Sequence, residues 1–233
     1  MEEAGFFMRP EYWLVIIIGI VGIFVQMRLQ AVFSKYSKVM FSGGMTGREV
    51  AEKMLRDNGI NDVKVVATKG NLTDHFNPAT KTVNLSESVY NSNSVSAAAV
   101  AAHECGHAVQ HATAYGPLKL RSALVPVVSF SSSWSIWIII LGIVIMNSTG
   151  SEILFWVGIG MIAMAAIFSI VTLPVEYNAS HRALAWLEKS TNMTREQQAQ
   201  AKEALSWAAR TYLVAAVSAV ATLIYYLGFA RRN

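Results

Sequence analysis

Long stretches without any charged residue constrain this 233-residue chain more than any other feature. A helix that crosses a bilayer needs about 20 predominantly apolar residues. Three uncharged stretches hold 30, 23 and 20 residues, namely 122–151, 153–175 and 211–230. A fourth, at 12–27, holds 16 residues and reaches spanning length if the helix extends back through residues 6–8. The sequence therefore predicts four transmembrane helices.

The composition agrees with a membrane protein and excludes two other classes. Only 15% of the residues are charged, whereas about 25% are charged in an ordinary soluble protein. Because 53% of the residues are hydrophobic, the chain is not intrinsically disordered. Cys105 is the single cysteine, so a disulfide framework is excluded as well.

The first apolar stretch resembles a signal peptide in position, but its flanks favour an uncleaved anchor. A signal peptide begins with positive charge and ends at a cleavage site between small residues. Here Glu2, Glu3 and Glu11 outweigh Arg9, and no such site follows Val25. We therefore expect a membrane anchor at residues 1–28.

Lysine and arginine predict the orientation in the membrane, because they concentrate in cytoplasmic loops. Residues 28–121 carry 11 of them and residues 176–212 carry five, whereas the other side carries three. Both termini should therefore face out and both polar segments should face the cytoplasm. The net charge of +4 follows from this topology, and basic residues do not alternate with aromatic ones as they would in a nucleic-acid-binding surface.

The polar segments contain signals for a small α+β lobe. Thr46 with Glu49, and Thr194 with Gln197, have the spacing of helix-capping boxes, and the second helix could continue into the last span. Strands are predicted at 63–67 and 82–85, and helices at 95–113, begun by Ser94 or Ser96, and at 176–188. The predicted fold is a mainly α integral membrane protein with this cytoplasmic lobe. We expect five segments: the anchor at 1–28, the lobe at 29–121, a membrane hairpin at 122–175, a cytoplasmic helical segment at 176–210 and a last transmembrane helix at 211–233.

The pentapeptide His103-Glu104-Cys105-Gly106-His107 has the H-E-x-x-H pattern of a zinc-binding helix. Four residues advance a helix by about 400° and about 6 Å, so both histidines lie on one face and can reach one ion. Glu104 is rotated by about 100° from His103, beside the metal rather than on it. It is therefore placed to serve as the general base that activates water. Cys105 points away from this face, and Gly106 should let another helix approach closely.

A catalytic zinc ion needs a third protein ligand. His111 lies about 12 Å along the helix from His103, too far for one ion to use all three histidines. We therefore expect His111 beside the site or on the surface. Glu176 directly follows the third span, which returns the chain to the side of the metal helix, and it is the favoured third ligand. The other candidates are His181, Glu188, Glu196 and Glu203.

Three segments together resemble the YugP-type neutral zinc metallopeptidases, which are bacterial membrane proteins related to HtpX-like and CAAX prenyl proteases. These segments lie at residues 102–111, 74–81 and 174–180, and the resemblance covers nearly the whole chain. It implies a plasma (inner) membrane protein with a cytoplasmic zincin-like lobe and one zinc ion per chain. The ligands would be His103, His107 and Glu176, and the base would be Glu104. Proteins or peptides would be the substrates.

The chain departs from that family at possible supporting residues. The family often has aspartate where this chain has Asn77 and Asn178, and the related proteases have aspartate at the position of Ser180. Asn178 or Ser180 could still accept a hydrogen bond from a ligand histidine, without adding a charge. Asp74 and His75 either line the substrate cleft or begin a turn.

Two further alternatives stay open. Residues 82–85 form either an edge strand that pairs with an extended substrate or an internal strand, and an oligomer or a membrane partner is possible. The favoured function is a membrane-embedded zinc endopeptidase that acts on membrane or membrane-associated proteins. The alternative is a non-catalytic zinc-binding adaptor or chaperone. Intact Glu104 favours the enzyme, because an adaptor has no need of an acid beside two histidines.

Overall fold

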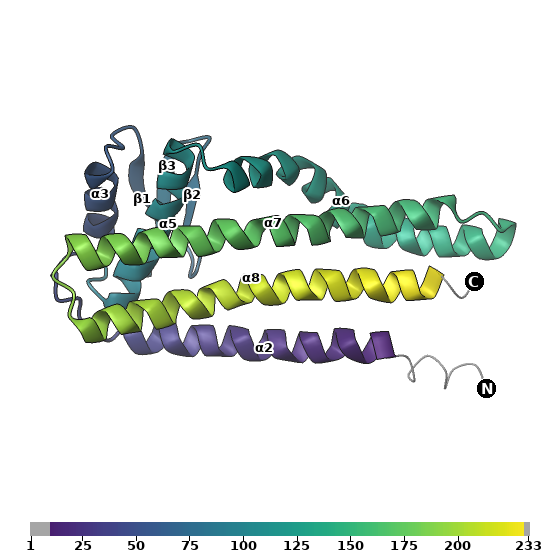
Figure 1. The fold of residues 1–233 in the computed structure, drawn as a ribbon, viewed down its shortest axis with the longest axis horizontal. Coiled ribbons are helices and arrows are strands. Elements are labelled where there is room, and N and C mark those ends of the chain that lie inside the picture. The colour runs from purple at the N-terminus through teal and green to yellow at the C-terminus, as the bar shows by residue number, and fades with distance from the viewer. Residues whose placement is uncertain (1–9, 231–233) are drawn as a thin grey trace. The chain divides into compact units, whose positions relative to one another are not determined.

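The computed structural model describes residues 10–230, and most of them are helical (Figure 1). Four helices are long and apolar enough to cross a membrane, as predicted. They are α2 (Pro10–Tyr36), α6 (Gly116–Thr149), α7 (Ile153–Ser190) and α8 (Arg195–Ala230). The expected extension through residues 6–8 and the flanking Arg9, Arg231 and Arg232 lie outside the described residues.

The chain forms two compact units, of which one contains most of the apolar stretches. Its described residues are 10–24, 120–173 and 211–230. Few of its large apolar side chains are buried, and Ile23, Phe130 and Trp137 are among the many exposed ones. In water such a surface would be unfavourable, but in a bilayer the lipid chains cover it. Two helices approach closely at Gly142, where an added Cβ would lie 2.6 Å from the backbone nitrogen of Phe155.

The other unit consists of residues 25–119 and 174–210 and contains a small sheet beside two helices. Figure 1 shows α3 (Gly47–Asp57) and α5 (Val95–Ala112) next to β1 (Lys64–Thr68), β2 (His75–Asn77) and β3 (Thr82–Ser86). The core packs Val50 and Met54 of α3 against Val83 and Leu85 of β3 and against the alanines of α5. The short helix α4 (Glu87–Tyr90) follows the sheet directly.

The strand order is β1-β3-β2, with β3 parallel to β1 and antiparallel to β2. Residues 82–85 are therefore internal, and the edge-strand alternative is wrong for them. Strand β2 lies next to β3 and forms one edge of the sheet. It has only three residues and was not predicted, because Asn77-Pro78 indicates a turn. Both predicted strands are confirmed within one residue of their expected bounds.

The predicted helix boundaries are confirmed where a side chain caps the helix. The Thr46 and Glu49 side chains form a reciprocal capping box, and the Ser94 hydroxyl accepts a hydrogen bond from the Ala97 backbone nitrogen. The Thr194 hydroxyl accepts a hydrogen bond from the Gln197 backbone nitrogen. The helix that follows continues without a break through the last apolar stretch. Likewise the expected helix at 176–188 is the end of α7 rather than a separate element.

Candidate metal centre

Helix α5 carries the two histidines on a rigid, almost entirely buried support. Alanines at 97–99, 101 and 102 pack against the core with exposed fractions of 1% or less. Because the helix is fixed along its length, the period of 3.6 residues determines where its polar side chains point. The rings of His103 and His107 lie with their centroids 4.8 Å apart and nearly perpendicular. They share one face, as the spacing predicted.

A close contact brings α7 to this face. A Cβ added to Gly106 would lie 2.6 Å from the carbonyl oxygen of Ala179 and 3.1 Å from its carbonyl carbon. Only glycine therefore permits this approach of α7 to α5. Glu176 lies one helical turn before Ala179, and its side chain points at the two histidines. A Glu176 oxygen lies 3.3 Å from His103 Nε2 and 3.4 Å from His107 Nε2. Glu176 itself is 1% exposed.

These three side chains fit a divalent metal ion such as zinc. Ligand atoms of a tetrahedral ion bound at about 2.0–2.1 Å lie about 3.3–3.4 Å from one another, which matches both distances to Glu176. One nitrogen or oxygen of each residue lies within 4.8 Å of the others, and within residues 10–230 no other group of three His, Cys, Asp or Glu side chains has this geometry. Two imidazoles and one carboxylate form a known donor set of catalytic zinc.

The electrostatics of the site favour a cation. Burial lowers the pKa of His107, but the hydrogen bond to Glu176 and the negative charges of Glu104 and Glu176 outweigh it, so the pKa is raised above its ordinary value. The two carboxylates thus stabilise positive charge at this position. A bound divalent ion would supply that charge while both imidazoles are neutral.

Glu104 lies beside the three side chains and is held by the sheet. Its Oε2 accepts a hydrogen bond of 3.1 Å from the backbone nitrogen of Phe76 in β2. It is 9% exposed, so the carboxylate is largely withdrawn from water. A residue in a strand directs its N–H and its C=O toward the same edge. Since the Phe76 N–H meets Glu104, the Phe76 carbonyl also points to the edge of β2 that faces away from β3.

Hydrogen bonds fix the orientation of both histidine rings. The Ser180 hydroxyl lies 3.1 Å from His103 Nδ1, so a neutral oxygen orients this ring. His107 Nδ1 lies 3.0 Å from Gln110 Oε1. Because an amide oxygen accepts, His107 Nδ1 carries the proton as a donor, which leaves its Nε2 free to bind a metal. The Ser180 contact at Nδ1 likewise leaves His103 Nε2 facing Glu176.

Gln110 was not predicted as a site residue. It is fully buried, and its Nε2 donates to the carbonyl oxygen of Val175 at 2.7 Å and to Asn178 Oδ1 at 3.0 Å. It therefore connects His107 on α5 to α7, and Asn178 contributes through this amide rather than directly. The signal that could have revealed Gln110 is its spacing, three residues beyond His107 on the same helical face.

The remaining candidates lie apart from the three side chains. His75 is exposed, with Nδ1 2.8 Å from the Thr73 carbonyl oxygen, and His111 is exposed with its ring against Phe76. Asp74 accepts hydrogen bonds of 2.7 and 3.1 Å from the backbone nitrogen and hydroxyl of Ser86. Burial raises the pKa of Asp74. Burial also raises the pKa of the Cys105 thiol, which points toward the carbonyl of Ala51.

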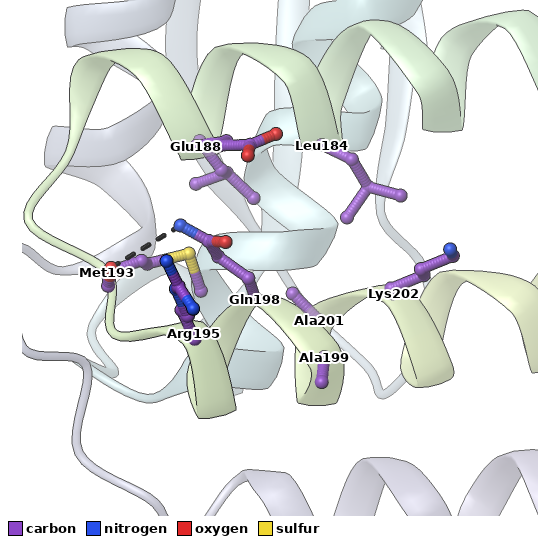
Figure 2. Close-up of a pocket in the computed structure, with 9 residues that line it drawn as sticks. Leu184, Glu188, Met193, Arg195, Gln198, Ala199, Ala201 and Lys202 are labelled. Atoms are coloured by element: carbon purple, nitrogen blue, oxygen red, sulfur yellow. Dashed lines mark hydrogen bonds between the residues drawn. The ribbon is translucent and has the colours of Figure 1, made fainter.

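The alternative third ligands are elsewhere. Glu203 accepts a hydrogen bond from Tyr36, and His181 and Glu188 are exposed. Figure 2 shows a pocket that Glu188, Arg195 and Lys202 help to line, between the end of α7 and the start of α8. Its volume is about 240 Å³. None of the four residues 103, 104, 107 and 176 lines that pocket, so it is separate from the candidate metal centre.

Comparisons with known proteins identify the family that this chain resembles. The family described as "Putative neutral zinc metallopeptidase" matches residues 11–231. The "Putative membrane protease YugP" of Bacillus subtilis (strain 168) is 40% identical over 202 residues, which cover 87% of this chain and 88% of that protein. No solved structure matches the chain.

Proposed function

This chain belongs to the neutral zinc metallopeptidase family, and on that premise we propose that it is a zinc-dependent endopeptidase that cleaves membrane or membrane-associated proteins. The observation that carries the proposal is the position of Glu176. Its carboxylate is 1% exposed and lies 3.3–3.4 Å from two imidazole nitrogens, which is the spacing of donor atoms around a tetrahedral zinc ion. A shared zinc ion would bind all three donors.

His103, His107 and Glu176 are the proposed ligands of one zinc ion per chain. Zinc held there would polarise the scissile carbonyl group and lower the pKa of water. Ser180 and Gln110 keep the two rings turned with Nε2 toward Glu176. Their hydrogen bonds reduce the reorganisation that binding and turnover would otherwise require.

Glu104 is the proposed general base. The Phe76 N–H holds its Oε2, which leaves the other oxygen to take a proton from the attacking water. The same carboxyl group then returns the proton to the nitrogen of the leaving amine, so that the peptide bond breaks to give an acid and an amine. Burial strengthens this exchange because few waters compete for the carboxylate.

The outer edge of β2 is the proposed place for the substrate backbone. An extended peptide can add to an exposed strand edge through main-chain hydrogen bonds. The Phe76 carbonyl at this edge would accept one from the substrate and set the peptide beside Glu104. This role passes to β2 because β3 lies inside the sheet.

We also propose that the enzyme lies in the plasma membrane with this centre on the cytoplasmic side. The support is the excess of lysine and arginine in residues 28–121 and 176–212, together with the four helices of spanning length.

Purified protein in detergent tests the enzyme. We expect about one zinc per chain by atomic emission and cleavage of casein that a chelator stops. Glu104→Gln should keep zinc and lose cleavage, since Glu104 is not a ligand, whereas the exposed Glu188→Gln should change neither. Zinc binding without any cleavage by the unmodified protein would instead indicate an adaptor or chaperone. Membrane proteins that are cleaved in cells with the unmodified enzyme but not with Glu104→Gln would be the natural substrates.

A further inference from the structure

A cavity of about 560 Å³ lies in the unit that contains the metal centre, and no step proposed above uses it. Its mouth includes the exposed Ser34 of α2, Ser37 directly after this helix, and Leu72 of the loop before β2. Its inner wall includes Asp74 and the fully buried Ser86. The remaining lining residues are Leu29, Gln30, Phe33, Asn71, Ser88, Val89, Ser96, Ala97 and Val100.

The cavity is adjacent to the proposed peptide-binding edge. Asp74 immediately precedes β2, and the Glu104 contact is at Phe76, two residues or about 6.6 Å further along the chain. Val100 lies one helical turn before both His103 and Glu104 on α5. A peptide extended along β2 would therefore bring a side chain to this cavity within about two residues of the cleaved bond.

The lining has the chemistry to bind a long basic side chain. Asp74 is the single ionisable residue among those that line the cavity, and none of the ion pairs within residues 10–230 involves it. Its carboxylate receives hydrogen bonds from the backbone nitrogen and the hydroxyl of Ser86. Burial raises the pKa of Asp74 because these bonds compensate the charge incompletely. A cation beside it would complete that compensation.

The other walls suit the rest of such a side chain. Leu29, Phe33 and Val100 are apolar and can cover an aliphatic stem, as the stems of lysine and arginine require. The hydroxyl groups of Ser88 and Ser96 can accept hydrogen bonds from the charged end. We propose that this cavity is a specificity pocket of the peptidase, which binds a lysine or arginine side chain of the substrate with Asp74 as its counter-ion. The inference rests on the proposed endopeptidase function.

The test uses fluorogenic peptides that are blocked at both termini and differ at one position within two residues of the cleaved bond. That position carries Arg, Lys, Gln, Met or Glu. At one position we expect kcat/KM to be about tenfold higher for Arg and Lys than for Gln and Met, and lowest for Glu, since one partly solvated charged hydrogen bond contributes about this factor. Asp74→Asn keeps the oxygen that faces Ser86 but removes the charge, so it should abolish the preference.

Ser88→Lys provides a second variant at an exposed position that lines the same cavity as Asp74. The Ser88 hydroxyl lies 3.2 Å from that of Ser86, which donates to Asp74. The ammonium group of the introduced lysine would pair with the Asp74 carboxylate. This variant should therefore also abolish the preference for Arg and Lys. Asp62→Asn is the matched control, because Asp62 is exposed and paired with Lys81 outside the cavity. It should retain the preference in full. Zinc content and thermal unfolding of each variant establish that it is folded.

Binding of labelled Arg and Gln peptides to zinc-loaded Glu104→Gln gives a readout that does not need turnover. The Arg peptide should bind about tenfold more tightly than the Gln peptide. Adding Asp74→Asn to this variant should remove that difference in affinity. Cleavage without a basic preference at any position would overturn the pocket and leave the peptidase intact. Cleavage of the Gln peptide only when its N-terminus is left unblocked would also overturn the pocket, because the bound cation would then be an α-amine. If no peptide were cleaved and none bound, the peptidase and the pocket would fail together.

Discussion

Gly106→Ala is the most informative substitution, because it tests what brings Glu176 to the histidines. The added Cβ would lie 2.6 Å from the carbonyl oxygen of Ala179 and 3.1 Å from its Cα. A carbon and a carbonyl oxygen normally lie no closer than about 3.3 Å. The contacted atoms belong to the backbone, so no side chain can rotate away. The two helices must separate by about 0.7 Å.

Opposing effects leave global stability little changed. Alanine favours a helix over glycine by about 1 kcal/mol, and overpacking a core costs about 1–3 kcal/mol. The free energy of unfolding should therefore fall by only about 0–2 kcal/mol. Zinc binding is more sensitive, since bond lengths at a metal tolerate changes of about 0.2 Å. A shift of about 0.7 Å at Glu176 should lower zinc affinity at least about tenfold.

A chelator competition titration measures this affinity, and thermal unfolding in excess chelator measures stability without the metal. Gly160→Ala is the matched control, because Gly160 lies inside α7 with no atom within 4 Å of an added Cβ. It should leave zinc affinity unchanged. Wild-type zinc affinity and cleavage in Gly106→Ala would refute the idea that this close contact positions the third ligand.

Three further predictions concern the ligands and the topology. Glu176→Gln should lower zinc affinity by at least about tenfold in a titration, because an amide oxygen replaces a carboxylate, whereas Glu188→Gln should leave it unchanged. Equal zinc affinities of the two variants would exclude Glu176 as a ligand. Ser180→Ala should lower zinc affinity by about tenfold, since His103 Nδ1 loses its partner, and an unchanged titration would mean that water replaces the hydroxyl. A cysteine at Ser148 should react with a membrane-impermeant reagent outside intact cells and one at Asn61 should not; the reverse pattern would place the metal centre outside.

Local periodicity explains which features the sequence could predict. The long helices follow from uncharged length, the caps follow from pairs three residues apart, and the shared face of His103 and His107 follows from one helical turn. Glu176 could be proposed because a hairpin of known span length returns the chain to its starting side. Its role as a ligand stays a prediction.

The features that were missed depend on pairing between distant segments. Strand β2 has three residues, too few for a periodic signal, and its existence depends on β3 beside it. The order of the strands is likewise a property of the assembled sheet. In the sequence Gln110 cannot be told from other helical glutamines. Its role depends on the Val175 carbonyl oxygen of α7, which accepts a hydrogen bond from its amide.

The hydrogen bond from Phe76 to Glu104 has a consequence for transplanting this chemistry. The donor is a main-chain amide, so any residue at position 76 except proline offers the same N–H group. A five-residue graft of His103-Glu104-Cys105-Gly106-His107 onto a helix of another scaffold would carry two imidazoles and the acid. The graft would lack the main-chain N–H group that orients the glutamate carboxylate. A designer would therefore have to build a strand edge beside the graft, and an alignment of side-chain identities would not reveal that requirement.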